Sequence, residues 1–114
     1  MTESTVFHKI LAGEIPSERV HEDSRCIVIR DINPQAPVHL LCIPKEYIRD
    51  ISVVTESQES ILGHLLLVAS SVAANEGLVA GGFRVVVNCG EDGGMEVPYL
   101  HLHILGGKKL PSLG

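Results

Sequence analysis

Two histidines stand two residues apart near the end of the chain, in the sequence PYLHLHILGG at positions 98–107. Side chains alternate between the two faces of a β-strand, so a strand here presents Tyr99, His101 and His103 on one face. The leucine and isoleucine side chains between them then belong to an apolar core on the other face. The two imidazoles, with Cα atoms about 6 to 7 Å apart, can address adjacent atoms of one ligand.

Three roles fit this pair of imidazoles. In the first, both are ordinary half-exposed strand residues without a chemical role. In the second, His101 and His103 bind zinc together with His39 from an earlier strand, although no fourth ligand is evident. In the third, one neutral imidazole attacks a phosphorus or acyl centre while its neighbour stabilises the developing charge. Nearby glycines favour an anionic ligand, because their backbone amides are unobstructed: Gly90, Gly93, Gly94, Gly106 and Gly107.

The composition indicates one cytoplasmic domain over residues 1–114. Hydrophobic residues make up 45% of the chain and aromatic residues only 4%, so the core must be built mainly from aliphatic side chains. The net charge is -5 and no basic stripe is present, which argues against nucleic acid as a partner. Cys26, Cys42 and Cys89 are far apart and lie in apolar runs, which is typical of buried free thiols in a reducing compartment. The N-terminus has no secretory pattern.

The hydrophobic pattern predicts an α+β domain with an antiparallel sheet of four or five strands, one short helix and one long helix. The short helix begins after Ser4 or Thr5 and ends before Gly13. The long helix runs from Thr55, with Gln58 completing a capping box, to about Gly77. Strands are predicted at residues 25–31, 38–43, 83–88 and 99–105.

The long helix has an unusual outer face. Its apolar stripe predicts packing on the sheet, yet no charged residue occurs from Ser60 to Asn75 on any face. This stretch is too short and too polar to span a membrane. We therefore expect a second subunit to cover the outer face, giving a homodimer, and the alternative is a solvated face of serine and alanine.

Four segments together resemble the histidine triad (HIT) family, in its Hint branch of nucleotide-binding proteins. They are HLHILGG, VVVNCGEDGG, ILGHLLLVA and the long N-terminal VFHKILAGEIPSERVHEDSRCIVIRDINPQAPVHLLCIPKEYI. The resemblance covers nearly the whole chain with matching order and spacing. It implies a homodimer whose two sheets join into one, binding of purine nucleoside monophosphates, and hydrolysis of nucleoside phosphoramidates such as adenylated amines without a required cofactor.

The resemblance also assigns roles to residues. His101 matches the nucleophile that forms a nucleotidyl-histidine intermediate, and His103 matches the imidazole that hydrogen-bonds the phosphate. Asp23 matches the acid that binds the ribose hydroxyls, and Asn88 matches an asparagine at the phosphate or leaving group. His39 resembles a family histidine beside the triad, and it is the residue that could add zinc binding. The further nucleotide-binding positions are Ile10, Ile15 and Ile32 near the base, with Gly94 and Glu96 in the loop before the histidines.

Two positions depart from the family pattern. Tyr99 stands where the first triad histidine is expected, and its backbone carbonyl can still fix the tautomer of His101. Glu96 stands where a serine hydroxyl is usual, and a carboxylate there repels an anionic substrate or leaves the leaving group without a donor. We therefore expect hydrolysis that is weaker or directed to another leaving group. The alternatives are a nucleotide-binding or regulatory protein with weak or no catalysis, and a zinc-binding protein.

Overall fold

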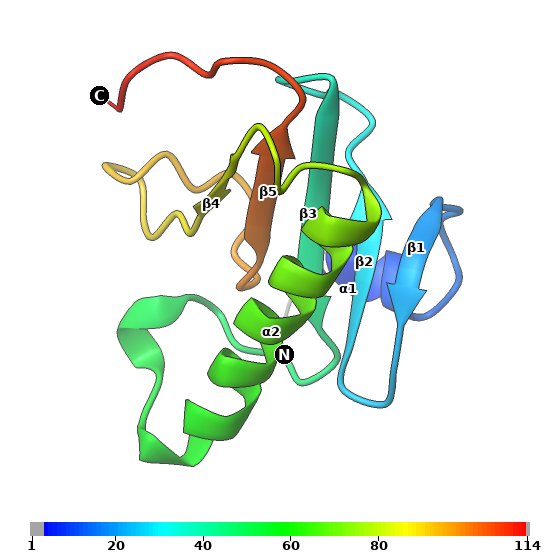
Figure 1. Ribbon diagram of the computed structural model, residues 1–114. Coiled ribbons are helices and arrows are strands. Elements are labelled where there is room, and N and C mark those ends of the chain that lie inside the picture. The colour runs from blue at the N-terminus through cyan, green and yellow to red at the C-terminus, as the bar shows by residue number, and fades with distance from the viewer. Residues whose placement is uncertain (1–3, 114) are drawn as a thin grey trace.

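A five-stranded antiparallel sheet organises the molecule (Figure 1). The computed structural model describes residues 4–113. The strand order is β1-β2-β3-β5-β4, so the last strand of the chain lies in the interior of the sheet. The strands are β1 (Arg19–Glu22), β2 (Cys26–Arg30), β3 (Val38–Pro44), β4 (Phe83–Val86) and β5 (Leu102–Gly106). The predicted α+β class and antiparallel sheet are confirmed.

Capping boxes stand at the start of the first helix and of the 3₁₀ turn that leads into the second. Helix α1 (Val6–Leu11) starts after Thr5, whose hydroxyl accepts a hydrogen bond from the His8 amide. The capping box of Thr55 and Gln58 is also present, but it opens a short 3₁₀ helix, η2 (Glu56–Gln58), from which helix α2 (Glu59–Asn75) continues. Another 3₁₀ turn, η1 (Ile51–Val53), precedes it. The predicted long helix is thus correct in position, while its first turn is tighter than an α-helix.

The strands depart from the prediction by more than one residue in three places. β1 was not predicted, β4 ends two residues earlier at Val86, and β5 begins at Leu102 rather than Tyr99. The shorter β5 has a clear cause. The Leu100 amide donates to the Ile48 carbonyl at 2.7 Å and the Tyr99 amide donates to the Val97 carbonyl at 2.8 Å, so neither amide joins the ladder. Tyr99 and His101 therefore lie in the turn that enters the strand.

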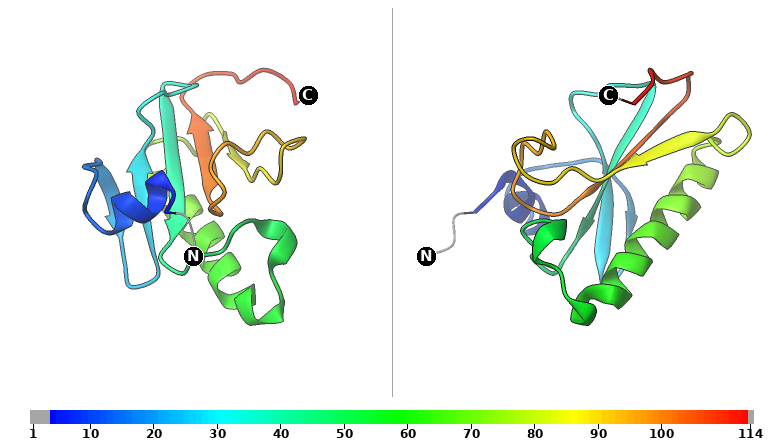
Figure 2. Two further views of the ribbon diagram at one scale, coloured as in Figure 1. Left: turned by 180° about the vertical axis from the view of Figure 1, so that it is seen from behind. Right: turned by 90° about the vertical axis from the view of Figure 1, so that its left-hand side faces the viewer.

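The two helices cover opposite faces of the sheet (Figure 2). On one face, α2 packs its buried stripe of Leu65, Val68 and Val72 against residues that include Leu102 and Ile104. On the other face, Phe7 and Ile10 of α1 pack in a second, smaller core around Tyr99. The histidine-bearing face is therefore partly covered as well, which the alternation pattern alone did not reveal.

The structure also shows how far the cysteines and the outer face of the long helix are buried. Cys26 and Cys42 are buried free thiols as predicted, whereas Cys89 is only partly buried. Leu66 and Leu67 on the outer side of α2 are 57% and 73% exposed. Among the residues that the structure describes, no helix combines the length and the apolar character needed to cross a membrane.

Candidate active site

The paired histidines lie on the face of the sheet that α1 covers. In the ladder between β3 and β5, Leu41 is the cross-strand partner of His103, and Leu41 belongs to the core around Tyr99. His39, two residues before Leu41 on β3, falls on the same face. His101 is 6% exposed and His39 is also 6% exposed, while His103 is partly buried. The fold thus brings three imidazoles together from two adjacent strands and the turn before one of them.

The protonation of His101 is set by the chain itself. Its Nδ1 lies 2.6 Å from the Tyr99 carbonyl oxygen. A carbonyl can only accept, so Nδ1 carries the hydrogen and donates it. In the neutral ring the lone pair is then on Nε2, the atom that a nucleophilic imidazole uses. Phe7 of α1 packs edge-on against the ring, with centroids 4.8 Å apart, and holds its orientation.

Tyr99 contributes its backbone, while its side chain is part of the core. The side chain is 1% exposed, and its hydroxyl donates to the Pro44 carbonyl at 2.6 Å. The ring lies beside the rings of His8 and Tyr47, with centroids 4.8 and 5.0 Å away. Burial, with nearby Tyr47 and Glu46, raises the pKa of Tyr99 to about 12. The phenol therefore stays neutral and stabilises the turn that presents the carbonyl.

His103 takes the opposite tautomer to His101. The Gln35 amide donates to Nδ1 of His39 at 3.0 Å, so the hydrogen of the neutral His39 ring is on Nε2. That Nε2 lies 2.9 Å from Nδ1 of His103 and donates to it. Nδ1 of His103 is therefore an acceptor and its hydrogen is on Nε2. One backbone amide thus fixes His103 as a donor next to a ring, His101, that offers a lone pair.

Asp31 is the acidic residue at this site. It follows β2 by one residue, and Oδ2 lies 3.4 Å from Nε2 of His39. Its other oxygen, Oδ1, accepts a hydrogen bond from the Asn33 amide at 2.8 Å, which orients the carboxylate. The Asp31 amide donates to the His39 carbonyl at 3.0 Å, so the backbones are joined too.

Burial keeps the three imidazoles neutral. Desolvation lowers the pKa of His101, although its hydrogen bond to Tyr99 and the charge of Asp31 oppose the change. Burial is also the main cause that lowers the pKa of His103 to about 4, with repulsion from protonated His101 and His39 adding to it. The pKa of His39 is lowered by burial against the attraction of Asp31. At neutral pH the site therefore holds uncharged nitrogen donors and acceptors.

The other predicted nucleotide-binding residues are less closely grouped. Asn88 lies two residues beyond Val86, the cross-strand partner of His103, and its amide donates to the Gly93 carbonyl at 2.7 Å. Gly94 has a φ of +74°, which favours glycine. Glu96 is exposed. Ile10 is 7% exposed in the core beside Tyr99, Ile15 packs against that core, and Ile32 is 90% exposed next to Asp31.

The structure does not bring Asp23 to this site. Its carboxylate accepts a hydrogen bond from His64 of α2 at 2.9 Å, and α2 covers the opposite face of the sheet. Asp31 occupies the histidine face instead. Alternation along β2 could have found it, because Asp31 continues the series of Ile27 and Ile29, which pack in the core around Tyr99. Phe7 was also missed as a site residue, since helical spacing gave it only a core role.

The predicted zinc ligands are only partly brought together. Asp31, His39 and His103 have ligand atoms within 4.8 Å of one another, so an acid takes the place expected for His101. Nδ1 of His101 is engaged by the Tyr99 carbonyl. Zinc binding at these histidines stays a prediction.

Neutral imidazoles of opposite tautomer, one with a lone pair and one with a hydrogen, suit nucleophilic attack on a phosphorus or acyl centre. The model of the HIT domain matches residues 12–110. A purine nucleoside phosphoramidase of Escherichia coli K12 is 42% identical over 110 residues, which are 96% of this chain and 92% of the relative. A HIT-like protein of Synechococcus elongatus is 48% identical over 110 residues, 96% of each chain.

Solved structures agree with these relatives. A histidine triad protein from Clostridium difficile matches with a TM-score of 0.93 and 43% identity, covering 100% of both chains. The chain therefore belongs to the HIT family.

The Tyr99 side chain and its carbonyl can be tested separately. Tyr99→Phe keeps the ring and the carbonyl, so we expect turnover within threefold of wild type and a loss of about 1 kcal/mol in stability from the hydrogen bond to Pro44. Tyr99→His loses that bond and puts a polar ring into the core, so we expect a larger loss of stability. Urea unfolding measures both. A large gain in turnover for Tyr99→His would contradict the prediction that the side chain at position 99 has only a structural role.

The lowered pKa of His101 predicts the pH dependence of kcat/KM. An imidazole that serves as nucleophile must be neutral, so with His101 in that role we expect activity to fall as pH falls through its pKa. Burial lowers the pKa of His101, so this acidic limb should lie below the ordinary value of about 6.5. Asp31→Asn removes a charge that raises this pKa and should move the limb to lower pH. A pH–rate profile for both proteins checks this, and a limb at or above 6.5 would exclude a desolvated nucleophile.

Proposed function

We propose that this protein binds purine nucleoside monophosphates and hydrolyses their phosphoramidates, adenylated amines among them. The observation that supports this most strongly is the hydrogen bond from Nδ1 of His101 to the Tyr99 carbonyl at 2.6 Å, which leaves the lone pair on Nε2. A purine nucleoside phosphoramidase that is 42% identical over nearly the whole chain supports the substrate class.

The reaction proceeds in two displacements. Nε2 of His101 attacks the α-phosphorus, the P–N bond breaks, and the amine leaves after taking a proton from solvent. The nucleotidyl group is then bound to His101, while Nδ1–H stays on the Tyr99 carbonyl and spreads the positive charge of the ring. Water attacks the phosphorus, the bond to Nε2 breaks, and the water's proton returns to solvent. The sum is phosphoramidate and water giving nucleoside monophosphate and amine.

Other residues bind the nucleotide. His103 donates Nε2–H to a phosphate oxygen, which stabilises the charge that develops during attack. Asn88 and the backbone around Gly94 lie on the loop that leads back to the histidines, where they can contact the phosphate. We assign the ribose hydroxyls to Asp31 in place of Asp23, because Asp31 is the carboxylate beside His39. Ile10, Ile15 and Ile32 stay candidates for contact with the base. No cofactor takes part in these steps.

His101→Ala is the direct test of the nucleophile. We expect turnover of a fluorogenic adenosine phosphoramidate to fall about 10⁴-fold or more, because no other group can form the covalent intermediate. AMP affinity by calorimetry should change less than tenfold, and circular dichroism confirms the fold. Trapping the nucleotidyl-enzyme by mass spectrometry supplies independent evidence. If wild type binds AMP but hydrolyses nothing, the protein is a nucleotide-binding module.

Glu96 should weaken the reaction. Its carboxylate replaces a hydroxyl that donates to the leaving group in the family, and loss of one such donor costs about 10²- to 10³-fold in rate. We expect Glu96→Ser to raise kcat, by up to about 10²-fold. Glu91→Ser, on the same loop and also exposed, is the matched control and should leave kcat unchanged. Equal rates for Glu96→Ser and wild type would show that Glu96 lies away from the leaving group.

We also propose a homodimer that covers the outer face of α2, where Leu66 and Leu67 are exposed without charged neighbours from Ser60 to Asn75. Joining two sheets would use an edge strand, β1 or β4. Leu67→Glu should convert the dimer to a monomer in sedimentation analysis, because it would bury a charge. Val53→Glu, exposed on η1, is the control. A wild-type monomer at micromolar concentration would exclude the dimer.

A further inference from the structure

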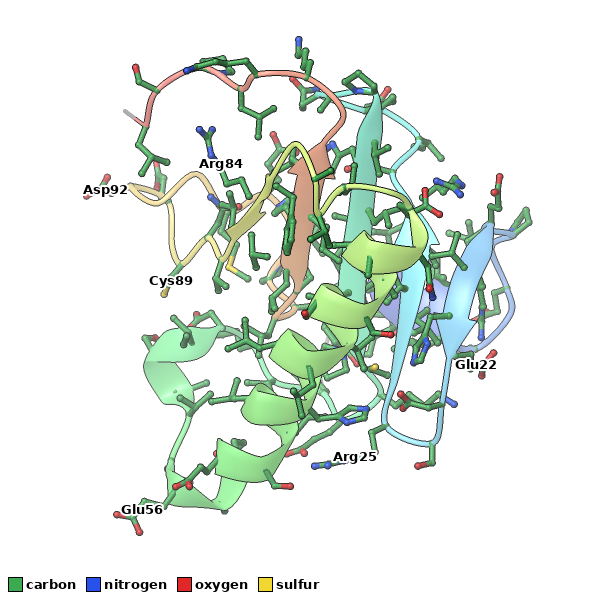
Figure 3. The ribbon with its side chains drawn as sticks, in the orientation of Figure 1. Glu22, Arg25, Glu56, Arg84, Cys89 and Asp92 are labelled. Atoms are coloured by element: carbon green, nitrogen blue, oxygen red, sulfur yellow. The ribbon has the colours of Figure 1, made fainter. Side chains whose placement is uncertain are left out.

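A second cluster of titratable side chains lies on the opposite face of the sheet from His101. It joins the turn between β1 and β2 to the middle of α2, near Arg25 in Figure 3. Asp23 is at its centre. One oxygen, Oδ1, accepts hydrogen bonds from the amides of Arg25 and Cys26 at 2.7 and 2.9 Å, which fixes the carboxylate plane.

The other oxygen of Asp23 faces three side chains. Oδ2 lies 2.7 Å from Nε2 of His21, 2.9 Å from Nε2 of His64 and 3.5 Å from Sγ of Cys26. A carboxylate oxygen has about two lone-pair sites, so three donors exceed what Oδ2 can accept. Three side chains therefore converge on one oxygen, and the Cys26 thiol, at 3.5 Å, is the most weakly held of them.

We propose that His21, Asp23, Cys26 and His64 bind one divalent transition-metal ion, zinc by preference. Two imidazoles, one carboxylate and one thiolate form a nitrogen, oxygen and sulfur set that suits tetrahedral zinc. The ligand atoms of His21, Asp23 and Cys26 lie within 4.8 Å of one another, and His64 joins them through Oδ2. Zinc bonds of about 2.0 to 2.3 Å require ligand atoms roughly 3.3 to 3.8 Å apart, so both imidazole nitrogens must move away from Oδ2. His64 lies outside the group within 4.8 Å, so its ring must also approach His21 or Cys26 when the ion binds.

The surroundings allow an ion to enter and be neutralised. The side chains of His21, Asp23 and His64 are 31%, 28% and 27% exposed, so the ion has a path from solvent. The Asp23 carboxylate accepts hydrogen bonds from His21, the Arg25 amide and His64, which hold it in place beside the ligand atoms. A thiolate at Cys26 with this carboxylate balances two positive charges. The nearby cation, Arg25, is turned toward the Ser60 hydroxyl at 3.2 Å.

The site would be structural. His21, Asp23 and Cys26 belong to the strand hairpin, whereas His64 belongs to α2, so one ion would link the edge of the sheet to the helix that covers it. It is separate from the group of Asp31, His39 and His103, because α1 and α2 lie on opposite faces (Figure 2). The proposal therefore does not depend on the hydrolytic function.

The test begins with full-length protein treated with chelator and then titrated with Zn²⁺ or Co²⁺. We expect one ion per chain and a higher Tm with Zn²⁺. Co²⁺ should give the intense visible bands of a tetrahedral ion and a thiolate charge-transfer band in the near ultraviolet. His21→Gln and His64→Gln should each weaken binding at least tenfold, and Cys26→Ala should remove the charge-transfer band.

His103→Asn is the matched control, because it removes a histidine from the cluster on the other face and should leave this binding unchanged. Three results would overturn the proposal: no saturable binding, binding that survives both His21→Gln and His64→Gln, or binding that His103→Asn abolishes. A cobalt spectrum without the thiolate band would overturn the four-ligand assignment. If the four side chains only hydrogen-bond to one another, no saturable binding should be seen and metal should leave the Tm unchanged.

Discussion

The hydrogen bond between Nδ1 of His101 and the Tyr99 carbonyl is the interaction on which the candidate active site depends. It assigns the hydrogen to Nδ1 and leaves the lone pair of the neutral ring on Nε2. The bond forms because the chain at Tyr99 and Leu100 has not yet joined the sheet, so the Tyr99 carbonyl is free to turn toward the ring. The buried Tyr99 side chain, with its hydroxyl on the Pro44 carbonyl, holds that turn against β3. Tyr99, a core residue, thus determines the tautomer of His101.

The same logic extends across the sheet to His103. The Gln35 amide, in the connection between β2 and β3, determines the tautomer of His39, and His39 determines that of His103. Two histidines two residues apart therefore reach opposite roles, one offering a lone pair and the other a hydrogen. Low exposure helps both, since desolvation disfavours the imidazolium that would erase the difference. Pairing of β3 with β5 brings the imidazoles together, and the Gln35 amide makes the tautomer of His103 differ from that of His101.

Much of the secondary structure and part of the candidate site could be predicted from the sequence. The sequence pattern identified α2, the capping box of Thr55 and Gln58 and most strand positions, because each depends on local contacts. The entry into β5 could not be predicted, because the amide of Leu100 pairs with Ile48, more than 50 residues earlier. The resemblance assigned the ribose-binding role to Asp23. The structure shows that Asp31, and not Asp23, lies on the same face of the sheet as the paired histidines. Alternation predicts which face a side chain joins inside a strand better than it does for residues just beyond the ends of the strand.

Asp23 and Asp31 show how one sheet separates two kinds of histidine chemistry. Each carboxylate lies beside imidazoles, but Asp31 approaches His39 only at 3.4 Å, and its attraction does not overcome the burial that lowers the pKa of His39. Asp23 lies within 2.9 Å of two imidazoles that are about one-quarter to one-third exposed, and a thiol approaches the same oxygen. A distant acid is compatible with the proposed nucleophile, whereas close convergence on one oxygen is compatible with the proposed ligand set. The two groups of histidines lie on opposite faces of the sheet, so neither proposal requires residues of the other.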